Sequence, residues 1–187
     1  FRDRFGIPIS DEQLETVPYY RPAEDSPELT YMNRRRETLG GPLPARKSEF
    51  KAMNVPGLKV FEKQLASSGK REISTTMAFV RVLSTLVKDK NIGKNVVPIV
   101  PDEARTFGME GMFRQLGIYT SVGQQYVPHD HEQIMYYKED KKGVILEEGI
   151  NEAGAMSAWL ALATSYSTNS YPMIPFYIFY SMFGFQR

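Results

Sequence analysis

The sequence predicts an α/β fold with a mostly parallel sheet and flanking helices. Two observations lead to this fold class. From residue 73 onward, segments with helical spacing alternate with short apolar segments, which is the order of elements in a parallel sheet crossed by helices. The last apolar segment, 174–180, is apolar and aromatic along nearly its whole length, as is typical of a strand covered on both faces.

Residues 1–72 lack this alternation, and we expect them to form an irregular inter-domain linker that wraps a surface. Prolines punctuate the segment at positions 8, 18, 22, 27, 42, 44 and 56. Two short helices are expected within it. One covers 10–16, where Ser10 can cap the first turn, and the other covers 57–67.

The α/β domain is expected to occupy residues 73–187 and to begin with a helix capped by Thr75 or Thr76. Its apolar positions recur at helical spacing: Phe79, Val80, Leu83, Leu86 and Val87. A short strand at 96–100 follows, although Pro98 removes one donor from the strand ladder. A second helix is expected where Met109, Met112, Phe113 and Leu116 share one face.

The second half of the domain repeats this order. After a loop at 117–128, residues 132–140 are expected to be helical, and 144–150 can hold a strand. Asn151 can cap the next helix. The expected apolar face of that helix contains Met156, Trp159, Leu160 and Ala163. The strand at 174–180 comes last.

Composition excludes several classes of protein. The 23 basic residues nearly balance the 22 acidic ones, whereas a nucleic-acid-binding protein would be dominated by basic residues. Cysteine is absent, which excludes disulfides and thiolate chemistry and fits a cytoplasmic location. The most apolar stretch, 173–185, is shorter than the roughly 20 residues that a membrane-spanning helix needs. We therefore expect neither a nucleic acid nor a membrane as a partner.

Both ends of the chain read as cuts in a longer polypeptide. The first residues contain charges and no long apolar stretch, so they do not form a signal peptide, and no initiator methionine is present. The last residues follow an apolar segment directly. We expect the α/β domain to be incomplete at its C-terminal end and to depend on the rest of the polypeptide or on a partner subunit.

Three groups of candidate site residues follow the predicted strands. They are Asp102-Glu103, Ile150-Asn151-Glu152 and the segment 180–183. Ligands of open α/β sheets bind outside the carboxyl ends of the strands, so these groups are expected to meet at one crevice. The alternative is that each carboxylate only caps a helix or forms an ion pair.

Glu152 stands out among these residues because small residues follow it, at Ala153, Gly154 and Ala155. Small neighbours would let a flat ring or a second subunit approach closely. The alternative is an acid placed in the first turn of a helix, where the helix dipole favours negative charge. The spacing alone does not decide between the two.

Other motifs carry less weight. His129 and His131 flank Asp130, but positions i and i+2 do not share a helix face, so a metal site there is not expected. The sequence contains no glycine-rich dinucleotide or phosphate-binding loop and no serine nucleophile elbow.

Three longer strings resemble the middle domain of the homodimeric pyruvate dehydrogenase E1 component. They are PDEARTFGMEG at 101–111, ILEEGINE at 145–152 and PFYIFYSMFGFQR at 175–187. Their order and spacing also agree with that family, and the resemblance covers nearly the whole chain, more loosely before residue 73.

The resemblance implies a thiamine-diphosphate-binding fold of the pyrimidine-binding type. In that family the cofactor lies between two α/β domains of different subunits, and Mg²⁺ and the diphosphate bind through a Gly-Asp-Gly motif. No Gly-Asp-Gly occurs in this sequence, so the Mg²⁺ would be bound by another part of the protein. The implied activity is decarboxylation of pyruvate with transfer of the acetyl group to the lipoyl group of the E2 acetyltransferase.

The resemblance also implies roles for individual residues. Glu152 matches the glutamate that hydrogen-bonds to the pyrimidine N1′ and thereby helps the ring to remove the C2 proton of the thiazolium. Asp102, Ile150 and Phe183 match residues around the pyrimidine ring. Glu103 and Tyr180 match residues nearer the substrate.

Two other functions remain open at this point. A related thiamine enzyme, such as another 2-oxo acid dehydrogenase or a transketolase-like enzyme, would use the same half-site. A non-catalytic interface module would not use this half-site at all.

Overall fold

The computed structural model of the chain describes residues 1–41, 45–47, 49–102, 104–129, 131 and 136–186. The chain divides into two compact units, Phe1–Arg46 and Lys47–Arg187. The change in sequence pattern at residue 73 lies inside the second unit.

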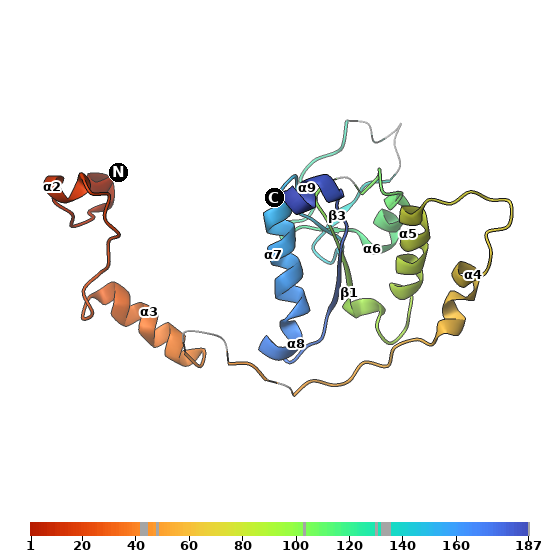
Figure 1. Cartoon of the computed structure of the whole chain (residues 1–187), viewed down its shortest axis with the longest axis horizontal. Helices are drawn as coiled ribbons and strands as arrows, with labels where there is room; N and C mark the ends of the chain where they lie inside the picture. The colour runs from red at the N-terminus through yellow and green to blue at the C-terminus, as the bar shows by residue number, and fades with distance from the viewer. Residues whose placement is uncertain (42–44, 48, 103, 130, 132–135, 187) are drawn as a thin grey trace. The chain divides into compact units, whose positions relative to one another are not determined.

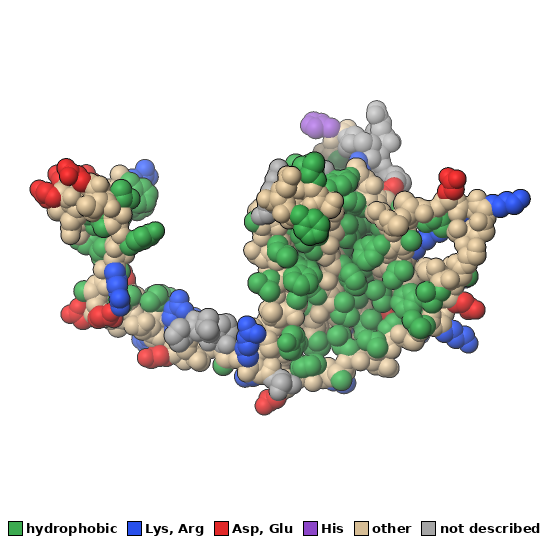
Figure 2. Space-filling view, in the orientation of Figure 1, with side chains coloured by type: hydrophobic (Ala, Val, Ile, Leu, Met, Phe, Trp, Pro, Cys, Tyr) green, Lys and Arg blue, Asp and Glu red, His purple; other side chains and the backbone are tan. Residues whose placement is uncertain are grey.

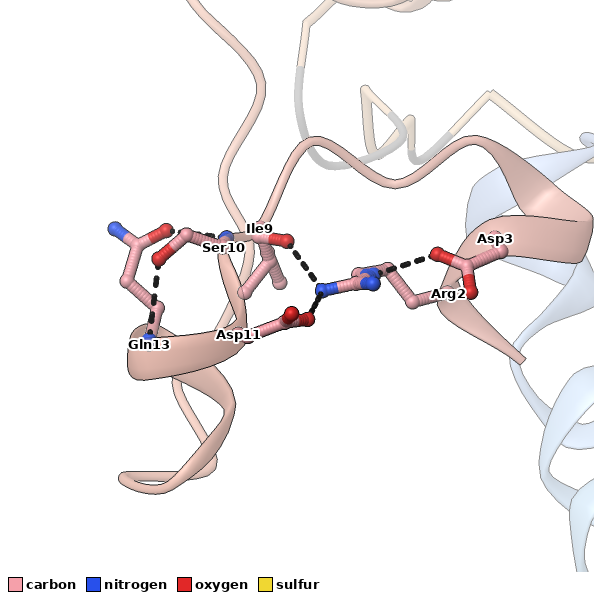
Figure 3. Close-up of polar contacts among 6 residues, drawn as sticks. All are labelled: Arg2, Asp3, Ile9, Ser10, Asp11 and Gln13. Carbon is pink, nitrogen blue, oxygen red and sulfur yellow. Dashed lines mark hydrogen bonds and ion pairs between the residues drawn. The ribbon is translucent and has the colours of Figure 1, made fainter.

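The first unit contains three helices and no buried helical residue among those described. These are α1 (Arg2–Phe5), α2 (Asp11–Leu14) and α3 (Pro27–Thr38). Ser10 caps α2 as expected, because its hydroxyl accepts from the Gln13 N–H at 3.3 Å while the Gln13 amide oxygen accepts from the Ser10 N–H at 2.9 Å. Arg2 ties α1 to this turn through the Ile9 carbonyl and the Asp11 carboxylate (Figure 3).

Helix α3 corrects the expectation of an irregular segment between the two short helices. Ser26 caps it by accepting from the Leu29 N–H at 3.3 Å, and Pro27 occupies its first turn. Proline is favoured there because its missing N–H would be unpaired in any case. The second helix expected in this region, at 57–67, is present only as a 3₁₀ turn η1 (Leu58–Phe61) followed by α4 (Glu62–Leu65).

The second unit is built around a parallel three-stranded sheet. Strand β1 (Val96–Val100) lies between β4 (Leu146–Glu147) and β5 (Ile174–Tyr177), and both neighbours run parallel to it. All five residues of β1 are buried. The α/β class with a parallel sheet and flanking helices is therefore confirmed.

Helices cover both faces of this sheet (Figure 1). On one face, α5 (Thr75–Leu86) and α6 (Glu110–Leu116) pack against Val96 and Val100. On the other, α7 (Glu152–Ala163) packs against Val97 and Ile99. Successive strand residues point to opposite faces, so one buried strand supplies both cores.

The remaining elements of the unit are short. They are η2 (Gly93–Asn95), the parallel pair β2 (Ile118–Tyr119) and β3 (Glu139–Asp140), α8 (Ser165–Thr168) and α9 (Ser181–Gln186). Gly143 crosses the backbone of Ile118 so closely that a Cβ there would lie 2.4 Å from the Ile118 carbonyl. No helix of the described part is both long and apolar enough to cross a membrane.

Several predicted boundaries are wrong. Ser74, rather than Thr75 or Thr76, caps α5. Residues 136–138 are irregular and Glu139–Asp140 form a strand, so the helix expected at 132–140 is absent from its described part. The strands expected at 144–150 and 174–180 are shorter, since β4 covers only Leu146–Glu147 and β5 only Ile174–Tyr177.

The expected faces also need correction. Strand β5 is half-buried along its length, and the strand covered on both faces is β1. On α7, Met156 and Leu160 are exposed, and the buried side instead includes Ala155 with Trp159 and Leu162 packed beside it. Figure 2 shows hydrophobic side chains gathered on the surface of the second unit.

Candidate active site

The carboxyl ends of the three strands meet at one edge of the sheet because all three run parallel. The pairing extends past the strands. The Glu148 N–H donates to the Val100 carbonyl at 3.0 Å, and the Ile178 N–H donates to the Ile99 carbonyl at 2.9 Å. The loops that follow β1, β4 and β5 therefore start side by side, which is where the sequence placed its candidate residues.

Glu152 is buried in the first turn of α7, with 6% of its surface exposed. Asn151 sets the start of the helix by accepting from the Gly154 N–H at 3.0 Å. A Cβ at Gly154 would lie 2.6 Å from the Asn151 amide nitrogen, so a larger residue there would have to displace the Asn151 side chain that caps the helix. A buried carboxylate at the positive end of a helix is stabilised by the dipole and can accept hydrogen bonds from a ligand.

Asp102 and Ile150 lie at the same edge, and both are exposed. Ile150 is 71% exposed and follows Gly149, whose φ is 74°. An exposed isoleucine beside a buried carboxylate gives this edge an apolar rim. Glu103 lies outside the described residues.

Tyr180 and Phe183 lie where β5 turns into α9. The Tyr180 hydroxyl donates to the Thr106 hydroxyl at 2.9 Å, and its ring lies 5.1 Å from Phe107 and 6.3 Å from Phe183. Tyr180 thereby links the end of β5 to the loop after β1. The structure thus brings the described residues of all three predicted groups to one edge.

An open cleft of about 660 Å³ lies against this edge, and Asp102 lines it. Residues that the sequence did not single out also line it, among them Arg105, Thr106 and Glu147. Burial, together with the charges of Asp102 and Glu139, raises the pKa of Glu147 to about 7, and the charge of Arg105 opposes this shift. Little in the sequence singles out Glu147, because a carboxylate within a strand usually indicates a position on the solvent-exposed face.

The two histidines take different positions. His129 lines the cleft, and the His131 Nδ1 lies 2.9 Å from the Pro128 carbonyl. Asp130 lies outside the described residues. Among the residues that the structure does describe, no three His, Asp or Glu side chains are grouped so as to hold a metal ion.

Comparison with known proteins identifies the family of the chain. The sequence pattern of the family described as "Pyruvate dehydrogenase E1 component middle domain" matches residues 53–187. The chain belongs to the pyruvate dehydrogenase E1 component family. The resemblance seen in the three sequence strings is therefore confirmed.

Individual pyruvate dehydrogenase E1 components match the chain over its whole length. The protein of Pseudomonas aeruginosa is 64% identical over 187 residues, that of Cupriavidus necator 62% over 188, and that of Escherichia coli 58% over 187. Each alignment covers 100% of this chain and 21% of the relative. The chain thus spans about a fifth of the length of the curated E1 components that it matches.

Proposed function

We propose that this chain supplies the pyrimidine-binding half of a thiamine diphosphate site in a pyruvate dehydrogenase E1 component. The reaction of the whole protein would be the oxidative decarboxylation of pyruvate, with transfer of the acetyl group to lipoyl-E2. The observation that supports this most directly is a nearly buried carboxylate, Glu152, at the edge where all three parallel strands end.

The side chains at this edge fit an aminopyrimidine ring. Such a ring needs one acceptor for a protonated nitrogen, an apolar rim and an aromatic surface. Glu152, Ile150 and Phe183 are of these types, and all three follow strand ends that lie together. Asp102 at the same edge can accept from a polar group of the ring.

The chain does not fit the diphosphate and Mg²⁺. The full sequence contains no Gly-Asp-Gly, and the described residues hold no group of three metal ligands. We therefore propose that another part of the protein binds the Mg²⁺ and the diphosphate.

Glu152 would act by holding a proton on the ring nitrogen. When bound, the cofactor supplies the electron sink that accepts the electron pair left by departing CO₂. The burial of Glu152 lowers the local dielectric, so a hydrogen bond to the ring nitrogen is stronger there than in water. Tyr180 and Glu103 would lie on the substrate side, with Tyr180 held by its bond to Thr106.

Exposed apolar residues on helix α7 also support the proposal of a partner subunit. Met156 and Leu160 are exposed by 53% and 57% on the helix that starts with Glu152. Burial of such side chains drives association. We propose that a second E1 subunit covers them in a homodimer, and that the whole protein works in the cytoplasm with pyruvate and the E2 acetyltransferase as its other partners.

Replacing Glu152 tests the proposal in the full-length protein. Glu152→Gln keeps the shape but removes the charge, so we expect pyruvate decarboxylation to slow by at least about a hundredfold. Glu148→Gln, four residues earlier, is the matched control and should retain turnover. The two variants should have circular dichroism spectra like that of the unmodified protein, and normal turnover of Glu152→Gln would refute the role.

The substrate class needs a separate assay. Turnover of the full-length protein is measured with pyruvate, longer 2-oxo acids and ketose phosphates. Preference for pyruvate supports the proposal, whereas preference for a ketose phosphate would identify a transketolase-like enzyme. No turnover with any of them would favour an interface module.

A further inference from the structure

Tyr177 is the last residue of β5 and points to the face of the sheet that α7 covers. It packs beside Val97, Ile99 and Ala155, whereas Ile174 and Phe176 pack on the opposite face. The Phe179 ring holds the Tyr177 ring at a centroid distance of 4.7 Å, and Phe179 in turn touches Phe185 of α9. The position of the Tyr177 side chain is therefore fixed by packing on several sides.

The Tyr177 hydroxyl is buried, and within the described residues it has no hydrogen-bond partner. Leaving a buried donor unpaired costs free energy, and buried tyrosine hydroxyls usually find a partner. A phenylalanine would fill the same space without that cost. The hydroxyl thus needs an explanation that packing does not give.

Helix α7 packs on the face of the sheet where Tyr177 lies. Glu152 and Ala155 are the two buried residues of α7, and their spacing of three places them on one face of the helix. Ala155 contacts the cluster that contains Tyr177, so Glu152 lies on the same side, one turn nearer the carboxyl end of the sheet. Burial raises the pKa of the Tyr177 phenol, and the charge of the Glu152 carboxylate raises it further.

We propose that Tyr177 is a positioning residue for Glu152. Its hydroxyl donates a hydrogen bond to one oxygen of the Glu152 carboxylate when the other oxygen binds the pyrimidine ring. The inference rests on the proposed role of Glu152. A carboxylate has two oxygens and about four lone-pair sites, so it accepts both bonds at once. The aromatic contacts of Tyr177 would then set the direction of the carboxylate.

The test measures thiamine diphosphate binding, with saturating Mg²⁺, by calorimetry on the full-length protein. The variants are Tyr177→Phe, Glu152→Gln and the double variant, with Tyr171→Phe at an exposed tyrosine as the control. Tyr177→Phe should weaken binding about tenfold, the effect of losing one hydrogen bond to a charged group. In the Glu152→Gln background the same change should have little further effect, since coupled residues are not additive.

Melting of the cofactor-free protein gives the second measurement. Tyr177→Phe removes an unpaired buried donor, so its melting temperature should equal or exceed that of the unmodified protein. Unchanged affinity, an equal loss in the Glu152→Gln background, or a lowered melting temperature would each overturn the inference. If Glu152→Gln alone leaves both affinity and turnover normal, the proposed function fails as well; if Glu152→Gln weakens binding and Tyr177→Phe does not, only the role of Tyr177 fails.

Discussion

Glu147 is a partly buried carboxyl group near the proposed site, and its pKa is raised. It is the last residue of β4, and its carboxyl group lines the same cleft as Asp102. Burial and the charges of Asp102 and Glu139 raise its pKa to about 7, so near neutral pH the group is close to half protonated. Protonation of Glu147 avoids placing a third negative charge beside those of Asp102 and Glu139.

Replacing Glu147 with glutamine should change how stability depends on pH. Because the pKa of Glu147 is raised from 4.5 to about 7 in the folded protein, its stabilising contribution is present at low pH and is lost as the pH rises through 7. Glu147→Gln should match the unmodified protein at about pH 4, below the unfolded pKa of 4.5, and be more stable by roughly 1–2 kcal/mol at about pH 8, after allowance for solvent screening.

Denaturant unfolding of the full-length protein at both pH values measures this difference. Glu148→Gln provides the control, because it removes a neighbouring carboxylate that does not line the cleft. An advantage of Glu147→Gln that is the same at both pH values would contradict the assigned cause.

For single residues, the sequence predicted those roles that depend only on neighbouring residues in the chain. Ser10 and Asn151 cap helices as expected, and both are polar residues just before an acidic first turn. Glu147 and Tyr177 could not be predicted, because their properties arise from burial against segments far away in the chain. Tyr177, for example, meets a helix that begins 25 residues earlier only after β5 pairs with β1.

At the scale of elements, the cap of α7 connects helix stability to the site. The Asn151 side chain accepts from the Gly154 N–H, and the next residue is Glu152. The same few atoms therefore determine where the helix begins and where the buried carboxylate lies.

Asn151→Ala should lower stability by about 1 kcal/mol, the usual cost of losing a helix cap. It should also reduce turnover of the full-length protein, because the first turn that holds Glu152 loosens. Asn151→Ser keeps a cap oxygen and should recover most of the lost stability. Melting temperature and turnover measured on the two variants test this, and an alanine variant as stable as the serine variant would contradict it.

The parallel sheet was predictable at this scale because its strands alternate with apolar-faced helices. Helix α3 was not, since none of its residues is buried and its pattern contains no apolar stripe. The prediction that Met156 and Leu160 lie on the buried face of their helix was wrong for a related reason. Helix α7 is apolar on most sides, so periodicity could not identify which side faces the sheet.

At the scale of the whole molecule, the proposed site is one half of a larger one. We expect the isolated 187-residue chain to show no micromolar binding of thiamine diphosphate with Mg²⁺, because its sequence lacks the Gly-Asp-Gly motif and its described residues hold no group of three metal ligands to anchor the diphosphate. Calorimetric titration measures this, with the full-length protein as the positive control. Micromolar binding by the isolated chain would show that the second half-site is wrongly assigned.

The central position of β1 also affects how the chain is made. Val96–Val100 pair with residues 146–147 and 174–177, which leave the ribosome much later. At roughly 5–20 residues per second, about 4–15 seconds pass between synthesis of the middle strand and of its last neighbour. Late in that interval the most buried strand of the fold can pair with β4 but not yet with β5, so one of its edges is still open. A nascent chain halted before residue 174 should therefore be a substrate for chaperones.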